Sequence, residues 1–387
     1  MDRKRAGRIA VHVLVAAYAA ACLWLFWQQS VADLSVGGEI PYESDLPLHL
    51  SMIIEDGWYY SFTAYAYKLL YGLFGGGTLG IAVFLAAVSA ATVYAMEAFV
   101  CHLGRYREKS WFTLLLALSL NLVMPVCVRA VGEYRYVSYQ AGNIWHNSTY
   151  LCMRLAALLT LLCYFRLEKK YGQGISLKEW CGFALLNVLC TGIKPSFLLV
   201  FSPIMGFFLL ADLFRHVPFK RILLFGSALL PSGLVLIWQN AVLFGAETGN
   251  GIAFHPWYIF SRHAEIPKLA VACSMLFCIL TVLLTLRRLP KEKEYLFIAL
   301  MSALGFLEAL CLVEDGSRAV DGNFLWGYSF CLFVLFAACA VQWLEPARTK
   351  RQWGLRAGLG LAYAWHLYCG LYFFLNLVAG ASYWMKM

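Results

Sequence analysis

Charged residues are scarce in this sequence of 387 residues: Asp, Glu, Lys and Arg together account for 14% of it. Water-soluble domains carry about 25%, so the deficit excludes an ordinary soluble globule, which needs polar side chains over its surface. Apolar residues make up 61% of the sequence and are gathered in long blocks. Blocks of roughly 18 or more such residues are typical of membrane-spanning helices, so membrane lipids are the expected surroundings.

Metal-ligand patterns are also missing, although the sequence contains 13 cysteines. No two of them form a CxxC pair, and no Cys/His spacing of a zinc site occurs. Most of the cysteines lie inside apolar blocks, where cysteine behaves as a small hydrophobic residue. We therefore expect no zinc site.

The net charge of +9 would suggest a nucleic-acid partner in a soluble protein. Here the basic residues form short clusters between apolar blocks, the pattern that orients a membrane protein. We therefore expect no nucleic-acid partner. The basic segment MDRKR precedes the first apolar block, and no small-residue cleavage site follows it. This block is expected to remain as a signal-anchor helix.

The apolar blocks predict an all-α polytopic membrane protein with a single transmembrane domain over residues 1–387 and no soluble domain. Each predicted span is close to the roughly 20 residues that a hydrocarbon layer about 30 Å thick requires. The eleven predicted spans are 8–28, 78–101, 110–128, 148–165, 177–193, 196–214, 220–244, 268–286, 294–313, 322–343 and 355–379.

The number eleven depends on a break within residues 177–214, which would otherwise form one helix roughly 57 Å long. Lys194 and Pro195 interrupt this stretch, because proline removes a backbone donor and biases the preceding residue away from helix. With the break, a cytoplasmic N terminus places most of the 31 basic residues on the inner side. Without it, the last three basic clusters fall outside, against the positive-inside rule. The same alternation places the C terminus outside.

The first outer segment, residues 29–77, contains two predicted helices that lie on the membrane surface. Ser44 or Asp45 can cap the first helix, Gly57 can end it, and polar side chains share one of its faces. The second, at about 58–73, is rich in Trp and Tyr, which favour the headgroup region. Further outer segments at 129–150, 245–267 and 314–326 add carboxylates, imidazoles and cations to the same side of the membrane.

An acidic residue soon after the first span, followed by histidine and a surface helix ending in glycine, resembles the GT-C superfamily of membrane glycosyltransferases. These residues are Asp45, His49 and Gly57 in the sequence SDLPLHLSMIIEDG. The resemblance implies a GT-C-like fold and inverting transfer of a sugar from a polyprenyl-phosphate donor to a lipid or glycan acceptor on the outer face. It also implies a location in the plasma membrane, here of a bacterium. Many family members carry a soluble C-terminal domain, which this sequence does not predict.

Such a transfer needs a group that takes the acceptor's proton, and a carboxylate at the membrane surface can do this. Asp45 is the first candidate because it matches the family's first-loop acid, Glu43 is the second, and His49 completes the predicted catalytic group. Phosphate charge needs cations or free N–H groups, and Lys194 stands where a helix begins. The predicted substrate-binding residues are Lys194, His146, Trp145, Arg154, Arg318, Asp321 and Glu308.

Each of these residues also has a structural interpretation. Asp45 can serve only as a helix cap, Lys194 can extend toward water from a helix end, and Arg318 can pair with Asp315. Glu308 lies within a predicted span, where charges are costly and often functional. Two outer carboxylates with His49 could hold a divalent cation, but no ligand spacing requires it.

Two other functions remain open. A transporter or flippase of a lipid-linked or polysaccharide substrate would need polar residues along the bundle, and the predicted spans contain few. A non-catalytic scaffold would leave the glycans of the cell envelope unchanged when the gene is deleted.

Overall fold

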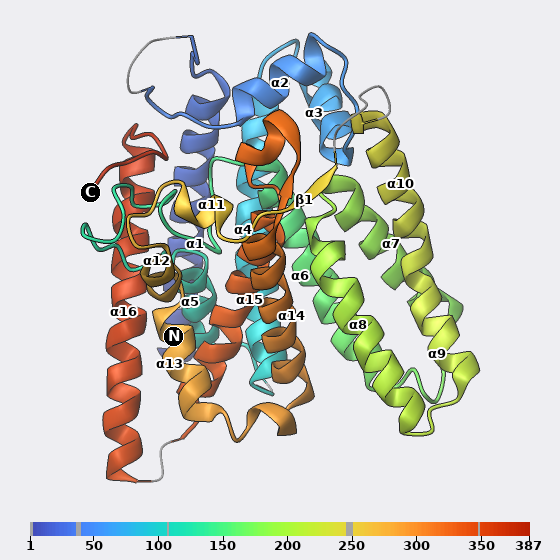
Figure 1. Ribbon diagram of the computed structural model, residues 1–387. Coiled ribbons are helices and arrows are strands. Elements are labelled where there is room, and N and C mark those ends of the chain that lie inside the picture. Colours follow the sequence, from blue (N-terminus) through green and yellow to red (C-terminus); the bar gives the residue numbers. More distant parts are fainter. Residues whose placement is uncertain (1–2, 36–39, 107, 245–250, 347–348) are drawn as a thin grey trace.

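The computed structural model describes residues 3–35, 40–106, 108–244, 251–346 and 349–387. Within these ranges the chain is a bundle of helices with one two-stranded sheet, in which β1 (Ile252–Phe254) pairs antiparallel with β2 (Leu312–Glu314) (Figure 1). The α-helices are α1 (Arg3–Ser30), α2 (Leu46–Ile54), α3 (Phe62–Leu73), α4 (Leu79–Leu103), α5 (Trp111–Leu120), α6 (Ser148–Glu168), α7 (Leu177–Ile193), α8 (Ser196–Phe214), α9 (Phe219–Gly226), α10 (Leu230–Phe244), α11 (Tyr258–Ser261), α12 (Pro267–Ser274), α13 (Leu276–Thr285), α14 (Lys293–Cys311), α15 (Leu325–Leu344) and α16 (Lys350–Val378). Short 3-10 turns are η1 (Ser227–Leu229), η2 (Leu289–Lys291) and η3 (Gly316–Asp321).

Eight helical segments in the described ranges are long and apolar enough to cross a membrane, which confirms an all-α, multi-pass membrane protein. They are α1, α4, α6, α8, α9 continued by α10, α14, α15 and α16. α12 and α13 would together form a ninth, but they meet at a bend of 70°. The predicted number of eleven also includes α5 and α7, with 10 and 17 residues. At about 15 Å and 26 Å they are shorter than the hydrocarbon layer, so the number eleven is not confirmed.

The predicted break at Lys194 and Pro195 is confirmed. α7 ends at Ile193, Lys194 has an extended backbone, and Pro195 stands at the N-cap position of α8. The ring of Pro195 removes the donor that would continue α7 through this point. Two helices therefore meet at Lys194, whose side chain is left beside the start of α8.

The predicted span 110–128 is helical only over α5, and the chain then runs irregularly to α6. The Nδ2 atom of Asn143 donates to the carbonyls of Leu120 and Val123, at 2.9 and 2.8 Å. These bonds replace the missing helical partners of both carbonyls. Asn143 itself is held by Arg154, whose NH1 atom lies 2.6 Å from its Oδ1 atom. The irregular segment 121–147 is thus fixed to α5 and α6, and it delivers His146 to the start of α6.

Both helices predicted in the first outer segment are present, as α2 and α3, and they cover one end of the bundle (Figure 1). Gly57 follows α2 with a φ of +70°, a left-handed conformation that glycine adopts without strain. Ser44 Oγ accepts from the N–H of Leu46 at 3.3 Å, while Asp45 at the N-cap position makes no side-chain cap bond. The carboxylate of Asp45 is therefore available for other partners.

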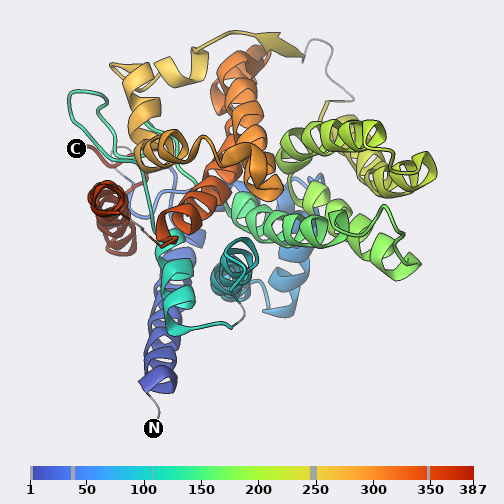
Figure 2. The same ribbon diagram turned by 90° about the horizontal axis from the view of Figure 1, so that it is seen from below.

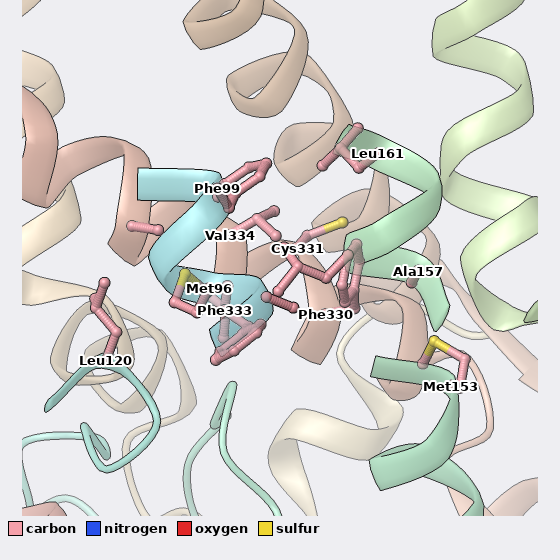
Figure 3. Packing of buried hydrophobic residues seen from close by; sticks show 14 of the residues in the cluster. Met96, Phe99, Leu120, Met153, Ala157, Leu161, Phe330, Cys331, Phe333 and Val334 are labelled. Atoms are coloured by element: carbon pink, nitrogen blue, oxygen red, sulfur yellow. The ribbon is translucent and has the colours of Figure 1, made fainter. Parts of the chain in front are cut away.

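α15 forms the centre of the bundle, and α4, α5, α8, α13 and α14 pack around it (Figure 2). Its apolar side chains lie between α4 and α6 (Figure 3). Phe330 and Phe333 of α15 are buried there with Met96 and Phe99 of α4 and Met153 of α6. Close packing of this kind fixes the relative heights of the helices, and with them the positions of the helix ends that carry the polar residues.

Glu97, which the sequence places inside a predicted span, is fully buried and paired. Its carboxylate accepts from NH1 and NH2 of Arg8 at 3.1 and 3.3 Å, and from Thr113 Oγ1 at 2.9 Å. The three residues belong to α1, α4 and α5. A buried carboxylate is tolerated when charge and hydrogen bonds surround it, so Glu97 has a structural role that joins three helices.

Candidate functional site

The first turns of α2, α6, α8 and α15 meet at the end of the bundle that carries α2 and α3. The N–H of Asp45 donates to the carbonyl of His146 at 3.1 Å, which joins α2 to α6. Lys194 Nζ lies 3.3 Å from Thr149 Oγ1 and 4.4 Å from the ring centre of Trp326, which joins the start of α8 to α6 and α15. Helix N termini carry partial positive charge, so four of them together make a setting that favours anions.

Asp45 is the acidic residue at this place. Its Oδ2 atom accepts from Nδ2 of Asn147 at 2.6 Å, a short bond of the kind expected for a charged acceptor. The Oδ1 atom of Asn147 caps α6 by accepting from the N–H of Tyr150 at 2.9 Å. The carboxylate is half-buried and its Oδ1 atom has no hydrogen-bond partner among the described residues. Asp45 thus has one oxygen held and one free.

His49 lies one turn along α2 from Asp45, with its N–H donating to the carbonyl of Asp45 at 2.9 Å. Burial lowers the pKa of His49 to about 4, although the charge of Asp45 acts in the opposite direction. Its Nδ1 atom is buried and has no hydrogen-bond partner among the residues that the structure describes. At neutral pH His49 is therefore a neutral imidazole that can accept or donate one hydrogen bond.

Lys194 supplies the cation of the site. Burial lowers its pKa to about 8, and the charges of Asp45 and Glu314 oppose this effect. Lys194 is thus mostly protonated at pH 7. In the described part of the chain it forms no ion pair within 4 Å, and its contacts are the hydroxyl of Thr149 and the face of Trp326. A cation without a counter-ion, beside helix N termini, is suited to bind an anionic ligand.

Aromatic side chains pack against one another next to Lys194 and Asp45. The ring of His146 stacks on Tyr383 with 4.2 Å between centroids, and Tyr136 meets His146 edge-on at 5.0 Å. Trp326 packs against Tyr150 at 5.7 Å. Burial lowers the pKa of His146, so it adds a neutral ring and no charge. These rings pack against one another, and this packing holds together the segments that carry them.

Arg318 and its partners form an adjoining polar group, built on the turn after β2. Arg318 Nε lies 2.7 Å from Oε2 of Glu314 and 3.9 Å from Oδ2 of Asp321. The same Glu314 oxygen accepts from Asn323 at 2.9 Å, and Trp326 Nε1 donates to Asn323 Oδ1 at 3.3 Å. Arg318 is thus held in local ion pairs, with Glu314 and Asp321, where the sequence suggested Asp315. This chain of contacts links Arg318 and Asp321 to Trp326 beside Lys194.

Two of the predicted site residues are buried inside the bundle. Trp145 is 1% exposed, and it donates from Nε1 to the hydroxyl of Tyr18 at 3.4 Å and packs on Phe374. Arg154 is fully buried, bonded to Asn143 and placed 4.7 Å from the ring of Phe333. Both side chains therefore hold the segment before α6 in place.

Among the described residues, Glu43 and Glu308 form no hydrogen bond or ion pair with Asp45 or Lys194. The carboxylate of Glu43 accepts from Ser382 Oγ in the segment that follows α16. Glu308 lies in the last turn of α14, and no side-chain bond to another described residue engages its carboxylate. The predicted outer segment 245–267 includes residues 245–250, which lie outside the described residues.

The structure adds residues that sequence reasoning did not select. Asn147, Tyr136 and Trp326 fall in predicted outer segments, where the sequence marks Asn147 only as the first residue of an Asn-Ser-Thr sequon. Tyr383 follows the last predicted span, where an aromatic residue usually indicates only the membrane boundary. Their roles depend on contacts between segments that are far apart in the sequence.

A metal ion has no evident place in this group. Among the residues that the structure describes, no three His, Cys, Asp or Glu side chains are placed to hold one. In this part of the chain, two outer carboxylates and His49 therefore do not form a site for a divalent cation.

Comparison with known proteins found no family model that matches this chain and no curated protein similar to it.

Proposed function

We propose that this protein is an inverting, GT-C-type glycosyltransferase of the bacterial plasma membrane. It moves a sugar from a polyprenyl-phosphate donor to a lipid or glycan acceptor on the outer face. In this proposal the chain crosses the membrane eleven times, from a cytoplasmic N terminus to an outer C terminus, and α2 and α3 lie on the outer surface. The observation that supports the proposal is that the Asp45 carboxylate and the Lys194 cation both contact the first turn of α6, at the end of the bundle where four helices begin.

The chemistry follows from these two groups. The acceptor hydroxyl attacks the anomeric carbon of the sugar from the side opposite the phosphate, and its proton passes to Asp45. The bond between the anomeric carbon and the phosphate oxygen breaks, and polyprenyl phosphate leaves with the electron pair. Lys194 and the N–H groups at the start of α8 stabilise the negative charge that develops on this phosphate. Because phosphate is a good leaving group, the reaction needs no strong general acid.

The first test replaces Asp45 by Asn in the purified full-length protein, assayed with a polyprenyl-phosphate sugar and envelope glycolipid acceptors. Loss of the base is expected to lower kcat by roughly 10²- to 10⁴-fold, because the amide cannot take a proton. Asp56→Asn is the matched control, since Asp56 is an exposed carboxylate just after α2.

Full activity of the Asp45→Asn variant would contradict the assignment of the base. Movement of the lipid-linked sugar across proteoliposome membranes without covalent change would instead support the transporter or flippase.

A further inference from the structure

Asn147 is engaged at both ends of its amide group. Its Oδ1 atom accepts from Tyr150 N at 2.9 Å and from Thr149 Oγ1 at 2.8 Å, which caps α6. Its Nδ2 atom donates to Oδ2 of Asp45 at 2.6 Å. The side chain is only 4% exposed, and the bonds at Oδ1 exclude the flipped amide, since an NH2 group could not accept from an N–H. The orientation of Asn147 is therefore fixed by the helix it caps.

We propose that Asn147 is a positioning residue, which holds Oδ2 of Asp45 so that Oδ1 is the atom that takes the acceptor's proton. The catalytic part of this inference rests on the proposed function. The cap bonds of Asn147 fix its side chain to the first turn of α6. Rotation of the Asp45 carboxylate would therefore break its 2.6 Å hydrogen bond from Asn147 Nδ2.

The groups around Asp45 show why the hydrogen bond from the Asn147 amide is important for the position of its carboxylate. The titratable groups that face it are His49 on α2, Tyr60 before α3, Tyr136 and His146 between α5 and α6, Lys194 between α7 and α8, Asp321 in η3 and Tyr383 after α16. At neutral pH two of these groups are neutral imidazoles, and Lys194 forms no ion pair with Asp45. Asn147 is the residue whose side chain donates a hydrogen bond to this carboxylate.

Two variants separate positioning from capping. Serine and aspartate both cap helices well, so Asn147→Ser and Asn147→Asp retain an acceptor for α6. Asn147→Ser removes the amide donor, and Asn147→Asp also puts a second carboxylate beside Asp45. The matched control is Asn187→Ser, because Asn187 is a buried residue in α7 whose side-chain amide donates to the carbonyl of Phe183 in its own helix.

The first readout needs no transfer activity. A carbodiimide modifies protonated carboxyl groups, and peptide mass spectrometry of the full-length protein gives the labelling of Asp45 at each pH. In Asn147→Asp the midpoint of Asp45 labelling is expected to move up by at least one pH unit, because adjacent carboxylates resist ionising together. Asn147→Ser is expected to raise it slightly, and Asn187→Ser to leave it unchanged.

The second readout is the split between kcat and KM. Loss of positioning is expected to lower kcat by about 10- to 100-fold in Asn147→Ser while the donor KM stays within threefold, because the interaction acts at the transition state. A labelling midpoint that is the same in Asn147→Asp and the wild type would overturn the inference, whatever happens to kcat. A shifted midpoint in a protein without any glycosyl transfer would leave the positioning role intact and reject the proposed function.

Discussion

Replacement of Lys194 by methionine tests whether Lys194 binds the anionic phosphate of the proposed donor. The cation lies 4.4 Å from the ring centre of Trp326 and has no ion-pair partner among the described residues, so a phosphate can take that place. Two unit charges 4 Å apart attract by about 4 kcal/mol at the dielectric of a protein surface. Part of this remains in the variant, because the helix N termini still favour an anion. We therefore expect kcat/KM for the donor to fall roughly 100-fold, equivalent to about 3 kcal/mol.

The pKa of Lys194 gives this prediction a direction in pH. Because burial lowers the pKa to about 8, the free protein loses this cation as the pH rises through 8. The wild-type kcat/KM is expected to decline on that alkaline side. Arginine stays charged over the whole range, so Lys194→Arg should retain part of the activity and lack the decline.

The effect of Lys194 on protein stability should change with pH in the direction opposite to the change in kcat/KM. A lysine whose folded pKa lies below its unfolded value of 10.5 binds its proton more weakly in the folded state. That cost is fully present below pH 8 and fades as the pH rises toward 10.5. Lys194→Met removes the cost, at most about 3 kcal/mol, so its thermal midpoint at pH 7 should equal or exceed that of the wild type.

The assay measures initial rates of sugar transfer between pH 6 and 9.5, together with thermal unfolding in detergent. Lys68→Met is the matched control, because Lys68 also lies 4.4 Å from a ring centre, that of Tyr59, but it is exposed and far along α3. If Lys194→Met keeps kcat/KM within threefold of the wild type, the phosphate does not bind at Lys194. An alkaline decline that persists in Lys194→Arg would assign the titration to another group.

Two further predictions concern groups outside the reaction itself. Arg8→Met leaves the buried carboxylate of Glu97 without its cation, which should lower the free energy of unfolding by about 3–5 kcal/mol. Denaturation in detergent measures this loss. The double variant with Glu97→Gln should recover most of it, and no recovery would contradict the pairing. His49 is neutral above about pH 4, so His49→Gln should leave the shape of the pH profile between 5 and 7 unchanged, and a lost inflection there would show that His49 carries charge.

Local features of the sequence predicted several elements correctly, because their cause lies within a few residues. Pro195 lacks the N–H that would continue α7, and it biases Lys194 away from helix, so the break after Ile193 could be read directly. The Gly57 turn and the two helices of the first outer segment follow from capping chemistry and aromatic content in the same way. Asp45 and His49 were selected for their resemblance to the GT-C pattern, His146 as a polar residue of an outer segment, and Lys194 because it stands where a helix begins.

Features that depend on partners far away in the sequence were not predictable. The span at 110–128 ends early because Asn143 bonds the carbonyls of Leu120 and Val123. The bend between α12 and α13 accompanies a bond from the N–H of Phe277 to the imidazole of His366 in α16. A hydropathy profile cannot detect such bonds, because an apolar segment has the same hydropathy whether its backbone N–H and C=O groups pair within a helix or with a neighbouring segment.

By itself, the sequence determined the class of this protein, a multi-pass bundle of apolar helices, because the cost of burying polar groups in lipid acts on each segment separately. It also determined which polar residues stand at helix ends. Only the tertiary structure decided which of those ends meet. Packing around α15 brings Asp45, Asn147, Lys194 and Trp326 together, and the same packing buries Trp145 and Arg154 inside the bundle. These residues lie together because four helices begin at one place, and the packing of the core determines where those helices begin relative to one another.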